Sequence, residues 1–338
     1  MHPNKNSSAS LLPSAPTSAL ARVGAAALFS VLALCGTASL AQTWPQRPVK
    51  FMVTLGPGAG ADVTARLLAE HLSKPLGQPV VVENRPGADG VIAITAFLSA
   101  RDDHLLLFTP TGSFTTHPYL LDKLTYDQNE LVPVARVSNT IIGISAPVSQ
   151  NINSLADLFA LSRANPGKLN WASVTGSTDL VFSGYLKAAG LSMVKVPYKD
   201  NVLAANDLAS GRIDAFLSAV VSVAPQVAAG KIRILALTNR ERAPATPDIP
   251  TAAQAGFPAL QFDGLAGLFS TSGMPAERRA RIANEVRAVI AVPAIAAQIA
   301  ATGQIVSPGS PAEFAASIDE QRAKFAVIAK ALGIQAKQ

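Results

Sequence analysis

The sequence predicts an α/β protein of two lobes that face each other across a cleft and are joined by two extended crossing segments. The chain has 338 residues, which is enough for two α/β lobes and more than a single core usually holds. From residue 49 onward, strand patterns alternate with helix patterns, which indicates parallel sheets with helices on both faces. Extended segments near residues 140–147 and 260–269 indicate that the chain leaves the first lobe and later returns to it.

Residues 1–41 have the pattern of a cleavable signal peptide. Lys5 and Arg22 are the only charged residues there, residues 23–34 are almost wholly apolar, and small residues precede an expected cut before Gln42. The apolar run is too short to remain as a membrane-spanning helix. We therefore expect export to the periplasm and a mature chain that is not embedded in the membrane.

The single cysteine and the charge balance argue against several kinds of partner and site. Cys35 lies within the apolar run of the signal peptide, so the mature chain needs no disulfide and has no cysteine metal site. A lipid anchor on Cys35 is the weaker alternative, because the preceding Leu34 is bulky where that processing requires a small residue. The formal net charge is +6, but the basic residues are scattered, so no nucleic-acid partner is expected.

The first lobe is predicted to be discontinuous and to comprise residues 42–143 and 263–338. Apolar runs of strand length predict its strands, at residues 49–55, 79–83 and 104–109. Apolar residues at helical spacing predict one helix that begins at Asp62 and another that ends at Ala100. In the tail, the same spacing predicts helices at residues 275–301 and 311–332.

The second lobe is predicted to comprise residues 144–262. Ser154 and Asp157 form a capping box that opens its first helix, which ends near Asn165. Strands are indicated at residues 169–174, 195–198, 213–220 and 232–238. A helix follows the first of these strands, and another covers residues 202–210.

Four strand ends share one chemical character, because they consist of small residues and hydroxyl groups and most of them lead into a helix. The start of a helix offers unpaired backbone N–H groups and the positive end of the helix dipole, so it binds an anion without a basic side chain. Ligands of open α/β sheets lie beyond the carboxyl ends of the strands. The four ends together predict a carboxylate-binding cleft, although each alone is more often a packing turn or a helix cap. The candidate residues are Gly58, Ala59, Gly60 and Ala61, then Thr109, Thr111, Gly112 and Ser113, then Thr175, Gly176, Ser177 and Thr178, and finally Ser218.

Two enzyme alternatives are weaker than a binding protein. The turn at residues 56–61 fits the G-x-G-x-x-A dinucleotide pattern, and Glu83 ends the next strand where a ribose-binding acid is expected. However, Pro57 stiffens this turn, and an exported protein meets no maintained nicotinamide pool. A serine hydrolase needs a partnered histidine, and no G-x-S-x-G elbow is present. No histidine pair or carboxylate cluster suggests a metal, so we expect no enzyme activity, no cofactor and no metal.

Several motifs occur in the order found in a known family. Trp44–Pro48 precedes the glycine-rich turn, VVVENRPGA follows at Val80–Ala88, and further matches lie at Pro166–Asn170, Val196–Lys199 and Pro247–Thr251. The matches extend over nearly the whole mature chain, and the VVVENRPGA string is quite specific. On these motifs, the sequence resembles the tripartite tricarboxylate transporter receptor family, also called the Bug family.

The resemblance implies a type II periplasmic binding-protein fold, in which two lobes close on the ligand. It implies a small carboxylate as ligand, such as an organic acid, an amino acid or an aromatic acid, held largely by backbone N–H groups and ordered water. It further implies delivery to the membrane permease subunits of a tripartite tricarboxylate-type transporter. A receptor that docks a membrane sensor kinase is the alternative, and a monomer is expected in either case. By motif, Asp62 and Ser173 join the candidate ligand-binding residues.

The sequence departs from the usual family pattern at three places near the expected cleft. The first turn usually reads P-P-G-G-x-x-D, but residues 56–62 read GPGAGAD. Asp179 stands where the second-lobe loop usually continues into a histidine, and Ser218 stands where a later strand often ends in an aspartate. Asp179 is expected to disfavour a second ligand carboxylate nearby unless it points away to cap its helix. These departures bear on ligand identity more than on the fold.

Overall fold

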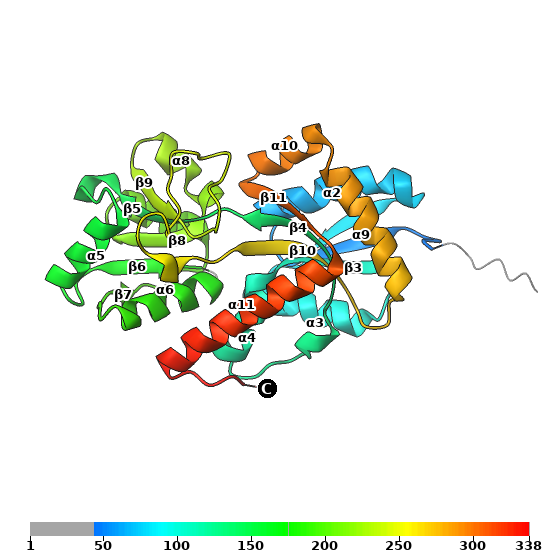
Figure 1. The fold of residues 1–338 in the computed structure, drawn as a ribbon, viewed down its shortest axis with the longest axis horizontal. Coiled ribbons are helices and arrows are strands. Elements are labelled where there is room, and N and C mark those ends of the chain that lie inside the picture. The colour runs from blue at the N-terminus through cyan, green and yellow to red at the C-terminus, as the bar shows by residue number, and fades with distance from the viewer. Residues whose placement is uncertain (1–43, 175, 338) are drawn as a thin grey trace, which may run out of the picture. The chain divides into compact units, whose positions relative to one another are not determined.

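The fold is built from two mixed β-sheets with helices packed against them (Figure 1). The computed structural model describes residues 44–174 and 176–337. The expected signal peptide at residues 1–41, with Cys35, lies outside the described residues, and so does the candidate binding residue Thr175.

The sheet of the first lobe has six strands, in the order β11-β4-β10-β3-β1-β2. The strand bounds are β1 Val49–Val53, β2 Val80–Asn84, β3 Leu105–Pro110, β4 Val132–Thr140, β10 Gly264–Ser270 and β11 Gln304–Gly309. The helix bounds are α2 Gly60–Leu76, α3 Val91–Ala100, α4 Thr111–Leu120, α9 Ala276–Ile290, α10 Pro293–Ala301 and α11 Pro311–Leu332. Phe97 of α3, Phe114 of α4 and Phe314 of α11 are fully buried in one apolar core against this sheet.

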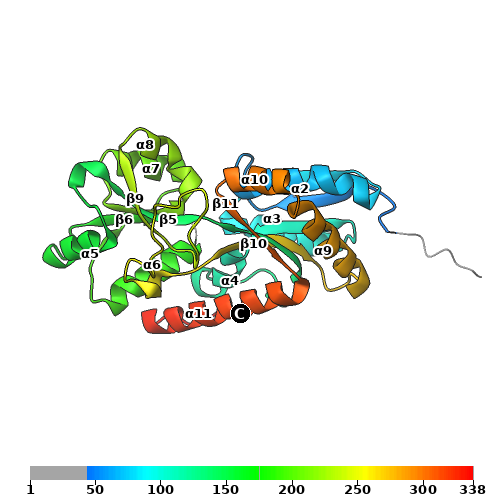
Figure 2. The ribbon, with the colours of Figure 1, turned by 45° about the horizontal axis from the view of Figure 1, so that its top comes forward.

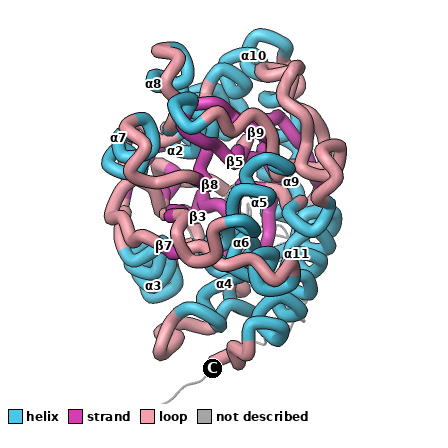
Figure 3. The backbone as a smooth tube through the Cα atoms, turned by 90° about the vertical axis from the view of Figure 1, so that its left-hand side faces the viewer, coloured by secondary structure: helices cyan, strands magenta, loops and turns pink. Residues whose placement is uncertain are grey.

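The sheet of the second lobe has five strands, in the order β7-β6-β8-β5-β9. The strand bounds are β5 Ile142–Pro147, β6 Asn170–Ser173, β7 Val194–Lys195, β8 Ala215–Ala219 and β9 Ile232–Leu237. The helix bounds are α5 Leu155–Ala164, α6 Gly176–Ala188, α7 Asn201–Ala209 and α8 Ala224–Ala228. The adjacent residues Phe216 and Leu217 of β8 point to opposite faces and join separate apolar cores. Figure 3 shows this lobe from its outer end, with the strands inside and the helices around them.

The two crossing segments make both sheets mixed rather than parallel. Only Ile141 separates β4 of one sheet from β5 of the other, and the chain returns directly before β10. β10 runs antiparallel to both β3 and β4, and β5 runs antiparallel to both β8 and β9. The parallel sheets expected from the sequence are therefore only partly parallel, because β5 and β10, at the two crossings, are central antiparallel strands. The lobe boundary expected after residue 143 falls inside β5, and the one expected after residue 262 falls just before β10.

Two further elements of the first lobe differ from the sequence prediction. β11 was not predicted, because its sequence contains Pro308 and Gly309, which are unfavourable inside a strand. The structure places β11 at the edge of its sheet, where a proline is tolerated. The single tail helix expected over residues 275–301 is two helices, α9 and α10, with a bend of 85° between them, and Pro293 begins the second.

Within the part of the chain that the structure describes, no single helix is long and apolar enough to cross a membrane. α9 and α10 pass that test of length and composition only when they are taken together across their bend.

The C-terminal helix α11 packs against both lobes. Its first half contributes Phe314 and Ile318 to the core of the first lobe, and its second half contributes Phe325 and Ala329 to a core of the second lobe. Gly184 of α6 allows this second contact, because a Cβ atom there would overlap the side chain of Ile328. Figures 1 and 2 show α11, in red, running past both lobes. The end of α11, which the sequence analysis places in the first lobe, thus also packs against the second lobe.

We expect Phe325→Ala to lower the free energy of unfolding by about 3–5 kcal/mol, the usual cost of truncating a buried phenylalanine. Phe325 is fully buried in the core of the second lobe. Val327→Ala is the matched control on the same helix, because Val327 is 70% exposed, and its effect should stay within about 0.5 kcal/mol. Urea unfolding of the two variants measures the difference. Equal stabilities would contradict a structural role of α11 in the second lobe.

Candidate functional site

A cavity of about 170 Å³ lies between the two lobes. The first lobe contributes the starts of α2 and α4, and the second lobe contributes the start of α6 and the end of β8. Thr140 of β4 and Ile142 of β5, on either side of the first crossing, also line it, as does Gly264 of β10. The volume is below the range of about 300–1,000 Å³ that is usual for drug-sized ligands. The cavity therefore suits a ligand of few heavy atoms.

Many of the predicted binding residues meet at this cavity although they come from separate strand ends. The candidate residues that line it are Ala59, Gly60, Ala61, Gly112, Ser113, Ser177, Thr178 and Ser218. The helices α4 and α6 approach closely here, since a Cβ atom on Gly112 would lie 2.7 Å from Oγ of Ser177. The two lobes are thus in contact along one side of the cavity.

Other candidate residues have partners inside the protein and do not line the cavity. Asp62 accepts hydrogen bonds from the backbone N–H of Gly58 at 2.8 Å and from Nδ2 of Asn84 at 2.7 Å. Burial alone would raise the pKa of Asp62, but these bonds and the neighbouring Arg66 guanidinium hold that pKa below its usual value. Asp62 therefore stabilises the turn before α2. We do not assign a ligand contact to Asp62 or Gly58.

The hydroxyl groups at the end of β3 also form hydrogen bonds within the first lobe. Thr109 shares a hydrogen bond of 2.9 Å with Oγ1 of Thr54, and Thr111 donates to Oε1 of Gln321 of α11 at 2.6 Å. Both threonines are fully buried. Ser173, at the end of β6, is buried away from the cavity as well. The two threonines are thus bonded within the first lobe, whereas the Ser173 hydroxyl has no hydrogen-bond partner among the described residues.

The start of α2 is the first of two polar ends of the cavity. The first backbone N–H groups of a helix have no partner within the helix, and in α2 they belong to Gly60, Ala61 and Asp62. A Cβ atom on Gly60 would lie 2.5 Å from the carbonyl oxygen of Thr302 and 2.9 Å from Nε2 of Gln304. Only glycine lets α2 begin this close to the segment that leads into β11.

Gln304, the first residue of β11, adds a side-chain donor at the same end. Its side chain is almost fully buried, and its Oε1 accepts hydrogen bonds from Oγ of Ser138 at 3.0 Å and from Oγ1 of Thr140 at 3.2 Å. These two bonds leave the Nε2 donor beside Gly60, where Gln304 lines the cavity. The sequence prediction missed Gln304 because it missed β11, and no local pattern marks a single glutamine as a binding residue.

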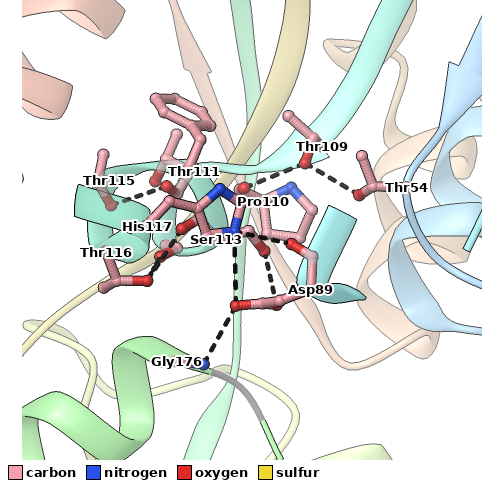
Figure 4. Close-up of polar contacts among 12 residues, drawn as sticks. Thr54, Asp89, Thr109, Pro110, Thr111, Ser113, Thr115, Thr116, His117 and Gly176 are labelled. Carbon is pink, nitrogen blue, oxygen red and sulfur yellow. Dashed lines mark hydrogen bonds and ion pairs between the residues drawn. The ribbon is translucent and has the colours of Figure 1, made fainter. Parts of the chain in front are cut away.

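Asp89 forms the second polar end of the cavity (Figure 4). It lies in the turn before α3 with a left-handed backbone φ of 49°. Its Oδ1 accepts a hydrogen bond from Oγ of Ser113 at 3.1 Å, and its Oδ2 accepts one from the backbone N–H of Gly176 at 3.3 Å. Asp89 therefore joins the first lobe to the start of α6 in the second. The sequence prediction treated it as an ordinary loop residue.

The charge of Asp89 is not balanced by the neighbouring histidine. Burial raises the pKa of Asp89 to about 6, although the hydrogen bonds from Ser113 and Gly176 act in the opposite direction. His117 of α4 has its Nε2 3.2 Å from the backbone oxygen of Asp89 and its Nδ1 2.5 Å from the hydroxyl of Tyr126. Burial lowers the pKa of His117 to about 4, so its ring is neutral at pH 7.

Asp179, one of the departures from the family pattern, does not line the cavity. It forms an ion pair with Nζ of Lys195 on β7 and accepts a hydrogen bond from Oγ of Ser183. It therefore points away from the cleft, toward Lys195 and Ser183, and not to the start of its own helix as the expected cap would.

One cluster elsewhere in the described chain has side chains that ligate metals. Asp102, Asp103 and His104 bring ligand atoms within 4.8 Å of one another. Arg47 pairs with Asp102 at 2.5 Å, and Arg278 pairs with Asp103 at 2.5 Å. Two guanidinium groups thus already balance the two carboxylates, so the cluster is explained as an ion-pair network.

Comparisons with known proteins agree with this architecture. A family model described as "Tripartite tricarboxylate transporter family receptor" matches residues 64–334. A UPF0065 protein of Bordetella bronchiseptica is 31% identical over 297 residues, which are 87% of this chain and 88% of its relative.

Two solved structures share the fold. An R. palustris protein solved with adipate has a TM-score of 0.77 and 28% identity, over 86% of this chain and 99% of the other. The periplasmic binding protein BugD has a TM-score of 0.74 and 27% identity, over 87% and 100%. The expected type II periplasmic binding-protein fold is thereby confirmed.

We expect Asp89 and His117 to give opposite pH dependences to stability. The folded protein holds the Asp89 proton more tightly than the unfolded chain does, so this group contributes more stability as the pH falls from about 6 toward 3.8. The folded protein binds the His117 proton less tightly, so this group costs stability as the pH falls from 6.5 toward about 4. The two contributions oppose each other over the same pH range in the wild type.

Asp89→Asn separates the two contributions. The melting temperature of this variant, relative to that of the wild type, should rise as the pH increases from 4 to 7, because the variant lacks the buried charge. Thermal unfolding across this range measures the difference. Asp122→Asn removes an equally charged but fully exposed side chain and should show no such rise. A flat or falling difference for Asp89→Asn would show that its carboxyl group is not held at a raised pKa.

Proposed function

The chain belongs to the tripartite tricarboxylate transporter receptor family, and from that premise we propose that it is a periplasmic solute receptor. It binds one small carboxylate in the cavity between the lobes and delivers it to the permease subunits of a tripartite tricarboxylate-type transporter. The proteins of this family are substrate-binding receptors, so we propose binding without chemical turnover. The R. palustris relative that was solved with adipate supports a carboxylate as the class of ligand.

The observation that carries this proposal is the group of donors at the start of α2. Gly60 and Ala61 present first-turn backbone N–H groups, and the Nε2 of Gln304 lies beside them. The helix dipole places partial positive charge at the same point, where a carboxylate is stabilised without a formal cation. Among the described residues that line the cavity, none is a lysine, an arginine or a histidine. The attraction for an anion therefore comes from fixed dipoles.

Closure of the lobes strengthens this attraction. The two crossings, at Ile141 and just before β10, are short, so the lobes move as units about them. When the starts of α4 and α6 meet, as they do at Gly112 and Ser177, water is excluded from that side of the cavity. Hydrogen bonds to a charged ligand are stronger in the lower dielectric that results. We propose that the contact between the two lobes reports ligand occupancy to the transporter.

A thermal-shift screen of small organic acids at neutral pH tests the ligand class. An acid at about 100 times its dissociation constant should add ~2.7 kcal/mol to the free energy of unfolding. The proposed function would be contradicted if no carboxylate raised the melting temperature while an uncharged solute did.

Gln304→Glu tests the proposed donor in a protein that keeps the acceptor for Ser138 and Thr140. The change removes the Nε2 donor and places an acid beside the ligand carboxylate. Because a hydrogen bond to a charged group contributes about 1.5–3 kcal/mol, binding of the acid found in the screen should weaken by at least about tenfold. Isothermal titration calorimetry at pH 8 measures the affinity.

Gln335→Glu is the matched control, because the same change is made at an exposed position near the C-terminus. Its affinity should equal that of the wild type. An unchanged affinity in a folded Gln304→Glu variant would place the ligand carboxylate elsewhere in the cavity.

A further inference from the structure

Two acidic side chains line the cavity, and only one of them has a cationic partner among the described residues. Asp263 accepts a hydrogen bond from the backbone N–H of Arg240 at 3.2 Å, and its Oδ2 lies 3.3 Å from Nε of the Arg240 side chain. Asp89 is bonded only to neutral donors, namely Ser113 and Gly176, and its His117 neighbour is neutral at pH 7. The wall of the cavity therefore carries one unbalanced negative charge, at Asp89.

The bonding of Asp89 also determines where a ligand carboxylate is able to sit. Its Oδ2 already accepts a hydrogen bond from the backbone N–H of Gly176, at the start of α6. The protein's own carboxylate thus takes the place that an anionic ligand would have at this helix start. The donors at the start of α2 and on Gln304 remain for the ligand. A ligand with a single carboxylate is directed to that end.

The rest of Asp89 is available to a donor on the ligand. Each carboxylate oxygen accepts up to two hydrogen bonds. Within the protein, Oδ1 of Asp89 accepts one from Ser113 and Oδ2 accepts one from Gly176. The side chain is 29% exposed, and it lines the cavity. A second ligand carboxylate placed here would meet a like charge in a partly desolvated site, which is unfavourable. A cationic group would balance the charge of Asp89.

We propose that Asp89 makes the cleft selective for an amino acid, whose carboxylate binds at Gln304 and the start of α2 and whose ammonium group donates to Asp89. This inference rests on the proposed function and assigns the substrate class of the same site. The apolar side chains of Leu55, Ile142 and Leu217, which also line the cavity, contact the carbon atoms between the two charged groups.

The cavity wall distinguishes an ammonium group from a quaternary amine. Quaternary ammonium groups are typically held by aromatic side chains, through cation–π contacts. Among the cavity-lining residues that the structure describes, none is aromatic. An ammonium group with N–H donors is instead matched by the acceptor oxygens of Asp89. The geometry therefore favours amino acids over betaines.

Calorimetry with matched probes tests this selectivity on the mature chain. The probes are α-, β- and γ-amino acids, each paired with an isostere in which a methyl group replaces the ammonium group, such as 4-aminobutyrate with pentanoate. A dicarboxylate of similar length, glutarate, completes that series. At least one amino acid should bind about tenfold or more tightly than its isostere and its dicarboxylate. Asp89→Asn should abolish this preference, and the exposed control Asp122→Asn should retain it.

A second measurement needs no variant and so does not depend on the folding of Asp89→Asn. An ammonium group beside Asp89 lowers the pKa of that carboxyl group from about 6, so amino-acid binding near pH 6 should release protons. The dependence of the binding enthalpy on the ionisation enthalpy of the buffer measures this release. The described titratable groups that face Asp89 are His117 and Tyr126. They stay neutral at this pH, because burial lowers the pKa of His117 to about 4 and raises that of Tyr126.

The outcomes separate the two proposals. Equal or tighter binding of pentanoate or glutarate, or no proton release with the amino acid, overturns the role of Asp89 and leaves the carboxylate receptor intact. An Asp89→Asn variant that keeps the preference does the same. Binding of an amine without a carboxylate as tightly as the amino acid, or failure of every carboxylate to bind, overturns the proposed function itself.

Discussion

The site depends on one close approach, between the start of α2 and the segment that leads into β11. Because Gly60 has no side chain, the carbonyl oxygen of Thr302 and the Nε2 of Gln304 are able to lie where a Cβ atom would otherwise clash with them. This contact brings a side-chain donor next to the first-turn N–H groups of a helix that is distant in sequence. β11 also pairs with β4, which continues through Ile141 into the second lobe. The donors are therefore fixed to the strand that connects the two lobes.

Local sequence patterns predicted most of the helices and strands, because local interactions determine them. The N-cap of α5 is an example, since the backbone N–H of Asp157 donates to Oγ of Ser154 at 3.1 Å. The expected capping box is only half formed, because the Asp157 carboxylate accepts from the backbone N–H of Asn153 rather than from that of Ser154. Properties that depend on pairing with distant segments were not predictable in the same way. The antiparallel direction of β10 and the strand β11 are set by neighbours in the sheet, and in β11 those neighbours override the unfavourable Pro308 and Gly309.

The candidate site shows the same division between local and distant interactions. The helix starts were identifiable from their small and hydroxyl-bearing residues. Hydroxyl side chains at one helix start, however, point in different directions. Ser113 lines the cavity, whereas Thr111, two residues earlier, points to Gln321 on α11. Asp89 is held both by Ser113 of its own lobe and by Gly176 of the other lobe. No pattern within the loop before α3 indicates this contact with the other lobe. The sequence therefore identified the segments that form the cleft, but not which charged and polar side chains line it.

The absence of a basic side chain from the described cavity wall and the presence of Asp89 are parts of one arrangement. An arginine in so small a cavity would form an ion pair with Asp89, so it would balance the charge that is unbalanced among the described residues of the wall. Backbone N–H groups and the Gln304 amide attract a carboxylate without neutralising an acid elsewhere in the cavity, because their partial charges are fixed in direction. The groups that attract the ligand carboxylate are therefore separate from Asp89, which discriminates at the other end of the ligand. Because Asp89 also bonds the start of α6, the group that discriminates is the one that joins the two lobes.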